Sequence, residues 1–351
     1  MSEEINTVVV GYGYAGRCFH SYLIKLTPGL RLYGIASRNP ETQEKIRQEQ
    51  SCRVYQSLEE VLKDEAVELV VLATPNSTHA EMAVKAMQAG KHVVTDKVMC
   101  LNLKQCDWMI ETSHRTKRLL SVFQNRRWDG DFLTLKKLVD TGKLGKLRWL
   151  EMSWQGFGPM RGWRARAEMG GGRYYDLGAH LVDQALLFFS SPIETVYGRL
   201  HHDFENSDTE SSALLVITFV EGSTAVCDLS SLNTISKPRF YACGTQGTFI
   251  KYGLDPQEKA MVAGDIDAAR EDPCFYGRWK KSTGEEEVIP TLPGRWRSYY
   301  ENIAEVLRGK AELLVKPEQV RQVIAVLEAG IISARKCQVV KFKKEGYDET
   351  L

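Results

Sequence analysis

The sequence predicts an α/β chain of two domains: an N-terminal doubly wound parallel sheet and a C-terminal α+β domain with a large, mostly antiparallel open sheet. Its 351 residues exceed what a single hydrophobic core usually holds. Short β-branched runs alternate with helix-period segments in the first part of the chain, and long alternating segments dominate the later part. We place the boundary so that the predicted domains are residues 1–123 and 124–351.

The first domain is predicted from strand-like runs and from helix start signals. Asn39 can cap a helix that has Pro40 at its first position, and Ser57 with Glu60 forms a capping-box pattern. A further helix is expected over 77–90. The runs rich in β-branched residues predict strands at 7–13, 30–37, 67–75, 91–97 and 119–125.

The second domain is predicted from segments in which apolar and polar residues alternate. With turn-like breaks between them, these segments indicate a mostly antiparallel sheet. They span 146–154, 194–202, 212–220 and 223–231. Helices are expected at 131–141, 174–189 and 317–334.

Composition excludes several classes of function. A net charge of +1 gives no single-sign field to attract nucleic acid or an anionic membrane. The eight cysteines show no metal-binding spacing, so we expect free thiols and no metal site. No apolar stretch is long enough for a membrane helix, and the N-terminus lacks the basic region of a signal peptide. We therefore expect a cytoplasmic protein.

Three glycines directly after the first predicted strand fit the pattern G-x-G-x-x-G. The first glycine allows a tight turn, the second lets the backbone approach a pyrophosphate, and the third lets the following helix pack closely. This context predicts a Rossmann dinucleotide-binding loop, although a glycine-rich turn without a ligand is the alternative. The predicted loop consists of Gly11, Tyr12, Gly13, Tyr14, Ala15 and Gly16.

The end of the second predicted strand bears on the choice of cofactor. NAD-selective sites usually place an acid there to bind the ribose 2′-hydroxyl. This chain has Ser37 and Arg38 instead, and a hydroxyl with a guanidinium suits a 2′-phosphate. We favour NADP(H) over NAD(H). In the alternative, Arg38 is a solvated surface residue and Glu41 reaches the ribose.

Two later segments carry candidate chemistry. Lys97 follows a strand end at the ligand edge of the predicted sheet, and Asp176 and His180 are four residues apart on a predicted helix. His180 is the proposed general base, Lys97 would stabilise developing alkoxide charge, and Asp176 would orient substrate hydroxyls. Taken singly, each of these residues is more often structural: a buried core histidine, a surface lysine and a helix cap. Their occurrence together with the glycine motif favours catalysis. The predicted cofactor site is completed by Thr74, Pro75, Asn76, His79, Asp96 and Lys97.

Five segments together resemble the Gfo/Idh/MocA family of oxidoreductases. They are VVVGYGYAG, ATPNSTHAEMAVKAMQAGKHVVTDK, SVFQNRRWDGDFLTLKKLVDTGKLGKL, GGGRYYDLGAHLVDQ and GTQGTFIKYGLDPQE. The last three are similar to a subgroup containing NADP-dependent scyllo-inositol dehydrogenases. The resemblance implies a Rossmann domain, an open sheet used for dimer formation, and catalysis by Lys97, Asp176 and His180. The family usually has proline after its lysine, where this chain has Val98, so the backbone beside Lys97 lacks a preset φ.

Substrate contacts are expected from two polar and aromatic segments and from the predicted catalytic helix. A glycine- and arginine-rich loop before that helix is a candidate lid. The alternative reading of each residue is a solvated charge or a packing aromatic. The candidates are Asn125, Arg127, Trp128, Arg161, Trp163, Arg164 and Gln184.

The predicted function is NAD(P)-dependent hydride transfer between the nicotinamide and a secondary hydroxyl or ketone of a cyclic polyol or sugar. We expect a homodimer or homotetramer that assembles through the C-terminal sheet. Two alternatives remain open. One is a redox-neutral enzyme that cleaves or epimerises sugars with a retained cofactor, and the other is a non-catalytic sensor of a dinucleotide or sugar.

Overall fold

The structure is a computed structural model that describes residues 4–343 and 346–347. Residues 1–3 and 348–351 of the predicted domains therefore lie outside the described residues. The described chain forms two compact units. The first holds the residues up to Asn125 together with Trp296–Arg321, and the second holds Arg126–Arg295 and the residues from Gln322 onward. Our sequence-based division assigned residues 296–321 to the second domain, whereas they pack within the first unit.

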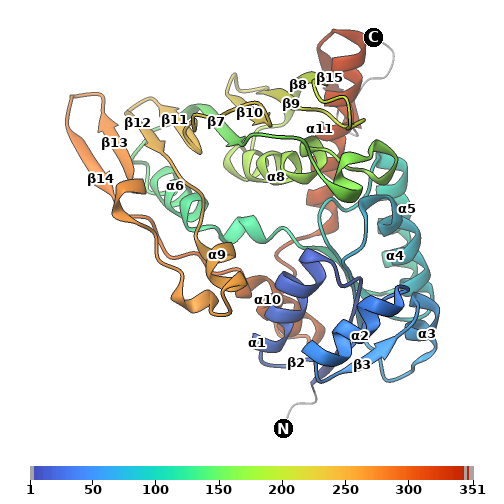
Figure 1. Ribbon diagram of the computed structural model, residues 1–351. Helices are drawn as coiled ribbons and strands as arrows, with labels where there is room; N and C mark the ends of the chain where they lie inside the picture. Colours follow the sequence, from blue (N-terminus) through green and yellow to red (C-terminus); the bar gives the residue numbers. More distant parts are fainter. Residues whose placement is uncertain (1–3, 344–345, 348–351) are drawn as a thin grey trace. The chain divides into compact units, whose positions relative to one another are not determined.

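In the described residues, the first unit contains a six-stranded parallel sheet in the order β3-β2-β1-β4-β5-β6 (Figure 1). The predicted doubly wound parallel sheet is confirmed. Strand β3 was missed because its three residues are too few to produce a recognisable alternation. The strands are β1 (Ile5–Val10), β2 (Leu30–Ala36), β3 (Arg53–Tyr55), β4 (Leu69–Leu72), β5 (His92–Thr95) and β6 (Leu120–Val122).

Helices cover both faces of this sheet. The chain runs outward from β1 in one direction to β3 and from β4 in the other direction to β6, so right-handed crossovers place the two sets of helices on opposite faces. Figure 1 shows α3, α4 and α5 on one side of the sheet and α1 with α10 on the other. The helices are η1 (Ala15–His20, a π-helical turn), α1 (Ser21–Leu26), α2 (Pro40–Glu49), α3 (Leu58–Lys63), α4 (His79–Gln88), α5 (Leu103–Thr116) and α10 (Arg297–Leu307).

The predicted helix starts after the second and third strands are confirmed by their caps. The side chain of Asn39 accepts a hydrogen bond from the backbone nitrogen of Thr42 at 3.0 Å, and Ser57 accepts one from Glu60 at 3.3 Å. The Glu60 carboxylate accepts from the backbone of Gln56 at 2.7 Å. Each cap satisfies a donor that the first helical turn leaves without an intrahelical partner.

Aromatic packing and two hydrogen bonds from hydroxyl groups hold residues 296–321 in the first unit. Trp296 and Tyr299 are buried, and the Tyr299 ring meets the edge of Phe123 with ring centroids 5.1 Å apart. The Tyr299 hydroxyl donates to the Ser121 hydroxyl at 3.0 Å, and Ser121 donates to the carbonyl of Val315 at 3.0 Å. This segment therefore packs against β6 and the residue that follows it, Phe123, in the core of the first unit.

In the described residues, the second unit contains a ten-stranded sheet in the order β14-β13-β12-β11-β7-β10-β9-β8-β15-β16. Strands β7 and β10 pair in parallel and the other neighbours are antiparallel, which confirms the mostly antiparallel sheet. The strands are β7 (Leu147–Gln155), β8 (Ile193–His201), β9 (Ser212–Phe219), β10 (Thr224–Ser230), β11 (Phe240–Gly244), β12 (Gly247–Lys251), β13 (Gly277–Lys281), β14 (Glu286–Ile289), β15 (Val340–Lys343) and β16 (Gly346–Tyr347).

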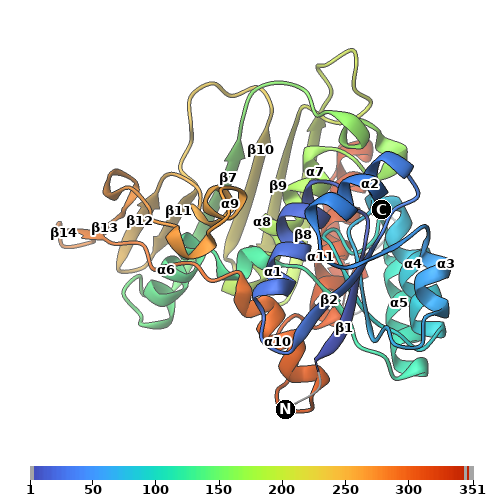
Figure 2. The ribbon, with the colours of Figure 1, turned by 60° about the horizontal axis from the view of Figure 1, so that its bottom comes forward.

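One face of the second sheet is covered by helices. Helix α8 (Gly178–Phe188) packs on β7 and β10, with α6 (Gly130–Asp140) beside it (Figure 2). Helix α11 (Pro317–Lys336) begins in the first unit and reaches β8, where a side chain added at Gly198 would lie 2.1 Å from the carbonyl oxygen of Gly330. Two glycines therefore permit close packing of this helix on the sheet. The short helices α7 (Arg173–Asp176) and α9 (Gln257–Val262) complete the unit.

Two expectations from composition can be compared with the structure. All eight cysteines are free thiols, as expected from their spacing. Among residues 4–343 and 346–347, no helix combines the length and the apolarity needed to cross a membrane.

His92 should make the stability of the protein depend on pH. Its Nδ1 accepts a hydrogen bond from the backbone nitrogen of Leu119 at 3.0 Å, and burial, aided by the charge of Arg118, lowers the pKa of His92 to about 4. The ordinary value is near 6.5, so the unfolded chain binds more protons between the two values and stability falls as pH drops through that window. We expect the thermal midpoint to fall less from about pH 7 to about pH 5 in His92→Gln than in the wild type. His202→Gln, at an exposed histidine, is the control and should follow the wild type. Equal pH dependence in all three proteins would contradict this.

Candidate functional site

The glycine loop has the shape that a pyrophosphate requires. Gly11 has φ of +100°, and a side chain there would lie 2.3 Å from the carbonyl oxygen of Ala73. A side chain at Gly16, within η1 (Ala15–His20), would lie 2.0 Å from the carbonyl oxygen of Gly11. Gly13 instead has no atom within 4 Å of its would-be Cβ. Two positions thus require glycine for packing, and the third leaves open space beside the backbone that a dinucleotide phosphate fits.

The side chains of the loop tyrosines point in different directions. Tyr12 is buried, and its hydroxyl donates to Glu49 at 2.9 Å and accepts from Gln50 at 2.7 Å. Burial raises the pKa of Tyr12 to about 12. Arg17 donates to both oxygens of Glu49 at 2.7 and 2.8 Å, so the end of α2 holds the loop. Tyr14 is half exposed and available to a ligand.

The sequence prediction of NADP(H) rests on two residues that directly follow β2. Ser37 is half-buried, its hydroxyl accepts from the backbone of Asn39 at 3.3 Å, and its carbonyl accepts from Gln43 at 2.7 Å. Arg38 is exposed directly after it, and so is Glu41. Arg38 is therefore exposed to solvent, and the sequence predicts that it contacts a 2′-phosphate.

The segment after β4 is tied together by its own side chains. The hydroxyls of Thr74 and Thr78 are 2.7 Å apart, and Thr78 donates to the carbonyl of Pro75 at 2.8 Å. Asn76 is buried at the start of η2 (Asn76–Thr78). His79 is completely buried, so its predicted role at the cofactor site would act through the backbone of this segment rather than by contact with a ligand.

Lys97 lies just beyond β5, beside an ionised carboxylate. Asp96 accepts a hydrogen bond from the backbone nitrogen of Lys97 at 2.8 Å. Burial alone would raise the pKa of Asp96, but contact with His20 and the positive charges of Lys97 and His79 lower it below its ordinary value. The Lys97–Val98 peptide bond is cis. Lys97 itself is half-buried.

The predicted catalytic helix is two helices. Helix α7 ends at Asp176 and α8 begins at Gly178, with Leu177 between them. The backbone nitrogen of His180 donates to the carbonyl of Leu177 at 3.1 Å, three residues back. The predicted helix over 174–189 is thus interrupted at Leu177, between Asp176 and His180, although Leu177 keeps helical dihedrals.

His180 lies in a buried setting of aromatic and cationic groups. Its ring stacks on Trp154 of β7, with centroids 6.1 Å apart and 25° between the planes. The guanidinium carbons of Arg126 and Arg239 lie 4.7 and 5.3 Å from the centre of the same tryptophan ring. Trp154 of β7 and Arg239, which directly precedes β11, were missed because both are distant in sequence from the catalytic motif.

Asp176 is joined to the glycine- and arginine-rich loop. Arg164 Nε lies 3.3 Å from Asp176 Oδ1, and its guanidinium carbon lies 4.6 Å from the centre of the Trp163 ring. Both partners of the ion pair are partly exposed, and Arg161 is exposed. The structure thus brings two predicted substrate residues, Trp163 and Arg164, to a predicted catalytic one.

Two other predicted substrate residues are engaged by the protein itself. Arg127 donates to both oxygens of Asp183 at 2.8 and 2.7 Å, and both side chains are buried. Gln184 is buried, donates to the carbonyl of Arg126 at 2.9 Å and accepts from Arg239 at 2.6 Å. These contacts hold α8 in place, and the substrate contact expected of Arg127 and Gln184 from the sequence stays a prediction.

The remaining candidates of this segment lie around η3 (Asn125–Trp128). Asn125 is buried. The carbonyl of Trp128 accepts from the backbone of Arg295 at 2.9 Å and from the side chain of Gln257 at 3.2 Å. The Trp128 side chain is half-buried, so it keeps surface that a ligand can contact.

Glu210 is a titratable group that the sequence reading missed. It accepts a hydrogen bond from the backbone of Tyr174 at the start of α7, and a side chain at Gly172 would clash with its carboxylate. Burial raises the pKa of Glu210 to about 7, and the charge of Asp176 adds to the shift. No local signal marks this residue, because it lies in a loop before β9.

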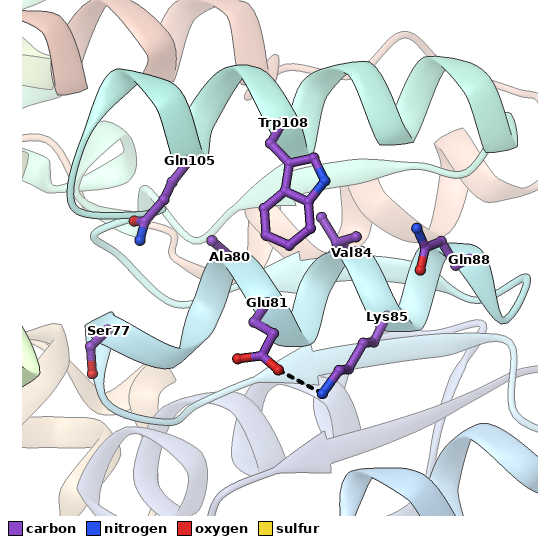
Figure 3. A pocket seen from close by; sticks show the side chains of 8 residues that line it. All are labelled: Ser77, Ala80, Glu81, Val84, Lys85, Gln88, Gln105 and Trp108. Atoms are coloured by element: carbon purple, nitrogen blue, oxygen red, sulfur yellow. Dashed lines mark ion pairs between the residues drawn. The ribbon is translucent and has the colours of Figure 1, made fainter.

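A surface groove of about 480 Å³ lies between α4 and α5, away from the glycine loop (Figure 3). Figure 3 shows Trp108 of α5 extending toward α4, where Glu81 and Lys85 form an ion pair at 2.6 Å. The groove contains none of the predicted cofactor or catalytic residues. Its lining consists of Ser77, Ala80, Glu81, Val84, Lys85, Gln88, Gln105 and Trp108.

Comparisons with known proteins agree with both units. Residues 5–124 match the model of the oxidoreductase family with an NAD-binding Rossmann fold, and residues 132–250 match the GFO/IDH/MocA C-terminal domain. The chain is 34% identical to the uncharacterized oxidoreductase YdgJ of Escherichia coli, over 95% of this chain and 98% of the relative. This chain belongs to the Gfo/Idh/MocA family of oxidoreductases.

Further relatives extend the likeness over the whole chain. The scyllo-inositol 2-dehydrogenase (NADP(+)) IolW of Bacillus subtilis is 33% identical, over 96% of each chain. The solved structure of yvaA from Bacillus subtilis superposes with a TM-score of 0.91 at 32% identity, covering 98% of this chain and 99% of that one. The family predicted from sequence is confirmed, and the chain is an oxidoreductase with an NAD(P)-binding Rossmann domain.

The buried pair Arg127–Asp183 should be important for stability. Removing one partner of a buried pair leaves an uncompensated charge and costs about 3–5 kcal/mol. We expect Arg127→Met to lose that much unfolding free energy in urea denaturation. Replacing both partners, in Arg127→Met/Asp183→Leu, should recover much of the loss. Lys281→Met removes an exposed pair with Glu285 and is the control, with a change of about 1 kcal/mol or less. An equally small change in Arg127→Met would contradict the prediction.

Proposed function

We propose that this oxidoreductase is an NADP(H)-dependent dehydrogenase that acts on a secondary hydroxyl, or the corresponding ketone, of a cyclic polyol or sugar. The main support is that the chain carries Lys97, Asp176 and His180, the catalytic residues that the family resemblance implies. It is also similar over 96% of its length to a scyllo-inositol 2-dehydrogenase (NADP(+)). The three catalytic candidates divide between the units: Lys97 belongs to the first, and Asp176 and His180 belong to the second.

The cofactor would be held by the edge of the first sheet. The open space at Gly13 suits the pyrophosphate, and the half-exposed Tyr14 is available beside it. Arg38 and Ser37 would bind the 2′-phosphate through a guanidinium and a hydroxyl. When bound, the nicotinamide supplies the site that accepts or donates the hydride. The remaining proposed contacts come from Gly11, Tyr12, Ala15, Gly16, Thr74, Pro75, Asn76, Asp96 and Lys97, with His79 acting indirectly.

The proposed chemistry needs a base, a cation and an orienting carboxylate. His180 would take the hydroxyl proton as hydride leaves the carbon, and would return it in reduction. The Lys97 ammonium would donate a hydrogen bond to the reacting oxygen and stabilise its developing negative charge. Asp176 would orient neighbouring substrate hydroxyls. Its contact with Arg164 supports a role for the glycine- and arginine-rich loop in binding the same substrate. Asn125, Trp128, Arg161 and Trp163 remain candidates for substrate contact.

For the oligomeric state and the cellular location of the protein, the proposal is the one made from the sequence. The face of the second sheet that carries Trp149 and Tyr241 leaves both aromatic rings more than a third exposed, which supports a homodimer or homotetramer through this sheet. Both this assembly and a cytoplasmic location stay predictions.

The cofactor preference can be tested at Arg38. A charge-assisted hydrogen bond is worth about 1.5–3 kcal/mol, so we expect Arg38→Ala to weaken NADP+ binding about tenfold or more and to leave NAD+ binding nearly unchanged. Arg47→Ala, at an exposed arginine near the end of α2 that pairs with Glu44, is the control. Isothermal titration of both cofactors measures the effect. A loss that is equal for NADP+ and NAD+ would argue against 2′-phosphate recognition by Arg38.

The function itself can be tested by following reduced nicotinamide absorbance with NADP+ or NAD+ and a panel of inositols, aldoses and glycosides. We expect turnover with at least one polyol, faster with NADP+. Lys97→Ala should still bind NADP+ through the glycine loop, and should lose turnover by about two orders of magnitude or more. Silence across the panel with cofactor still bound would instead support a redox-neutral enzyme or a sensor. Wild-type turnover in Lys97→Ala would overturn the catalytic assignment.

A further inference from the structure

Two buried histidines lie on either side of the Lys97 backbone. His20 ends the η1 turn that follows the glycine loop, and His79 begins α4. Both side chains are completely buried. They come from different helices, yet both contact the short segment that carries Lys97.

His79 joins the segment after β5 to the segment after β4. Its Nδ1 lies 2.8 Å from the carbonyl oxygen of Val98, and its Nε2 lies 2.9 Å from the carbonyl oxygen of Thr74. Carbonyl oxygens only accept hydrogen bonds, so a neutral ring can donate to one of them and a protonated ring to both. A protonated ring therefore bridges the carbonyl of Val98, the residue that follows Lys97, to that of Thr74, whereas a neutral ring holds one of the two by a hydrogen bond.

His20 reaches Lys97 from the other side, through Asp96. Its Nε2 lies 3.7 Å from Asp96 Oδ2, and the other carboxylate oxygen accepts from the backbone nitrogen of Lys97 at 2.8 Å. The His20 Nδ1 lies 2.6 Å from the hydroxyl of Tyr300, which is also buried. If that hydroxyl donates to Nδ1, the ring presents N–H at Nε2 to the carboxylate. The Phe123 ring, with its centroid 4.6 Å from that of His20, fixes the imidazole plane.

Neither histidine has exposed surface with which to touch a substrate or a cofactor. Asp96 is the charged group beside both rings: its Oδ2 lies 3.7 Å from His20 Nε2, and its charge opposes the lowering of the pKa of His79. Burial lowers the pKa of His79, although the two carbonyls and Asp96 oppose the shift. Any contribution to the reaction must therefore pass through the backbone on each side of Lys97.

We propose that His20 and His79 are positioning residues that hold Lys97 from both sides, His20 through the Asp96 carboxylate and His79 through the Val98 carbonyl. The inference rests on the proposed role of Lys97. A displacement of about 1 Å at a reacting group can cost on the order of a hundredfold in rate, so loss of either histidine lowers kcat while the glycine loop still binds cofactor.

The experiment compares His79→Leu, His79→Gln and His20→Leu in the full chain. His79→Leu removes both ring contacts, whereas His79→Gln keeps an amide N–H that can donate to one carbonyl. His92→Gln is the matched control, because it alters another histidine of the same sheet, at the opposite end of β5 from Lys97. Each protein is measured by hydrogen–deuterium exchange over residues 96–101, by NADP+ titration and by kcat and KM with the polyol that the panel selects.

We expect faster exchange over residues 96–101 in both leucine variants, NADP+ affinity within about threefold of the wild type, and a kcat lowered about tenfold or more with little change in KM. His79→Gln should recover part of the lost kcat. His92→Gln should leave exchange over 96–101 and kcat unchanged. If His79→Leu does not fold, His79→Gln supplies the comparison, and if His20→Leu does not fold, His20→Gln supplies it.

The outcomes separate this inference from the proposed function. Unchanged exchange and wild-type kcat in His79→Leu and His20→Leu, with Lys97→Ala inactive, would overturn the positioning role alone. Wild-type turnover in Lys97→Ala would overturn the catalytic assignment. If no polyol is oxidised, the exchange measurement still decides whether the histidines hold the Lys97 segment.

Discussion

The close approach of the Gly11 backbone to the carbonyl of Ala73 sets the geometry of the whole cofactor edge. A side chain at Gly11 would lie 2.3 Å from that oxygen, and one at Gly16 would lie 2.0 Å from the Gly11 carbonyl. The loop after β1 is therefore compressed against the end of β4, its neighbour at the point where the strand order reverses. The position of Thr74 depends on this approach, because Thr74 directly follows Ala73. His79 contacts the carbonyls of both Thr74 and Val98, so it links this segment to the residues around Lys97.

Local signals made the first unit largely predictable. The glycine spacing, the Asn39 cap and the position of Lys97 after a buried strand each depend on residues close together in sequence, and short-range sterics and capping determine them. The same signals could not show that Trp296–Arg321 returns to this unit, because its anchors are Ser121 and Phe123, far away along the chain. Long-range packing leaves no periodic trace in the sequence.

The second unit was less predictable because its polar residues are occupied by partners distant in sequence. Arg127 looks like a cleft residue from its neighbours, but its Nε and Nη2 donate to the two carboxylate oxygens of Asp183 in a buried pair. Gln184 is likewise fixed by Arg239. The break at Leu177 between α7 and α8 was missed because the apolar periodicity continues through it. The pattern of apolar and polar residues in a sequence indicates which residues are buried. It does not indicate which partner a buried polar side chain will bind.

The placement of Lys97 shows the same dependence on tertiary contacts. In the family it resembles, a proline commonly follows the lysine and restricts φ through its own ring. Val98 carries no such restriction, but its side chain is buried and its carbonyl lies against His79, while Asp96 is held near His20. A local restraint and a set of long-range contacts can fix the same short segment. In this chain the long-range contacts are in place, so the valine does not by itself argue against a working lysine.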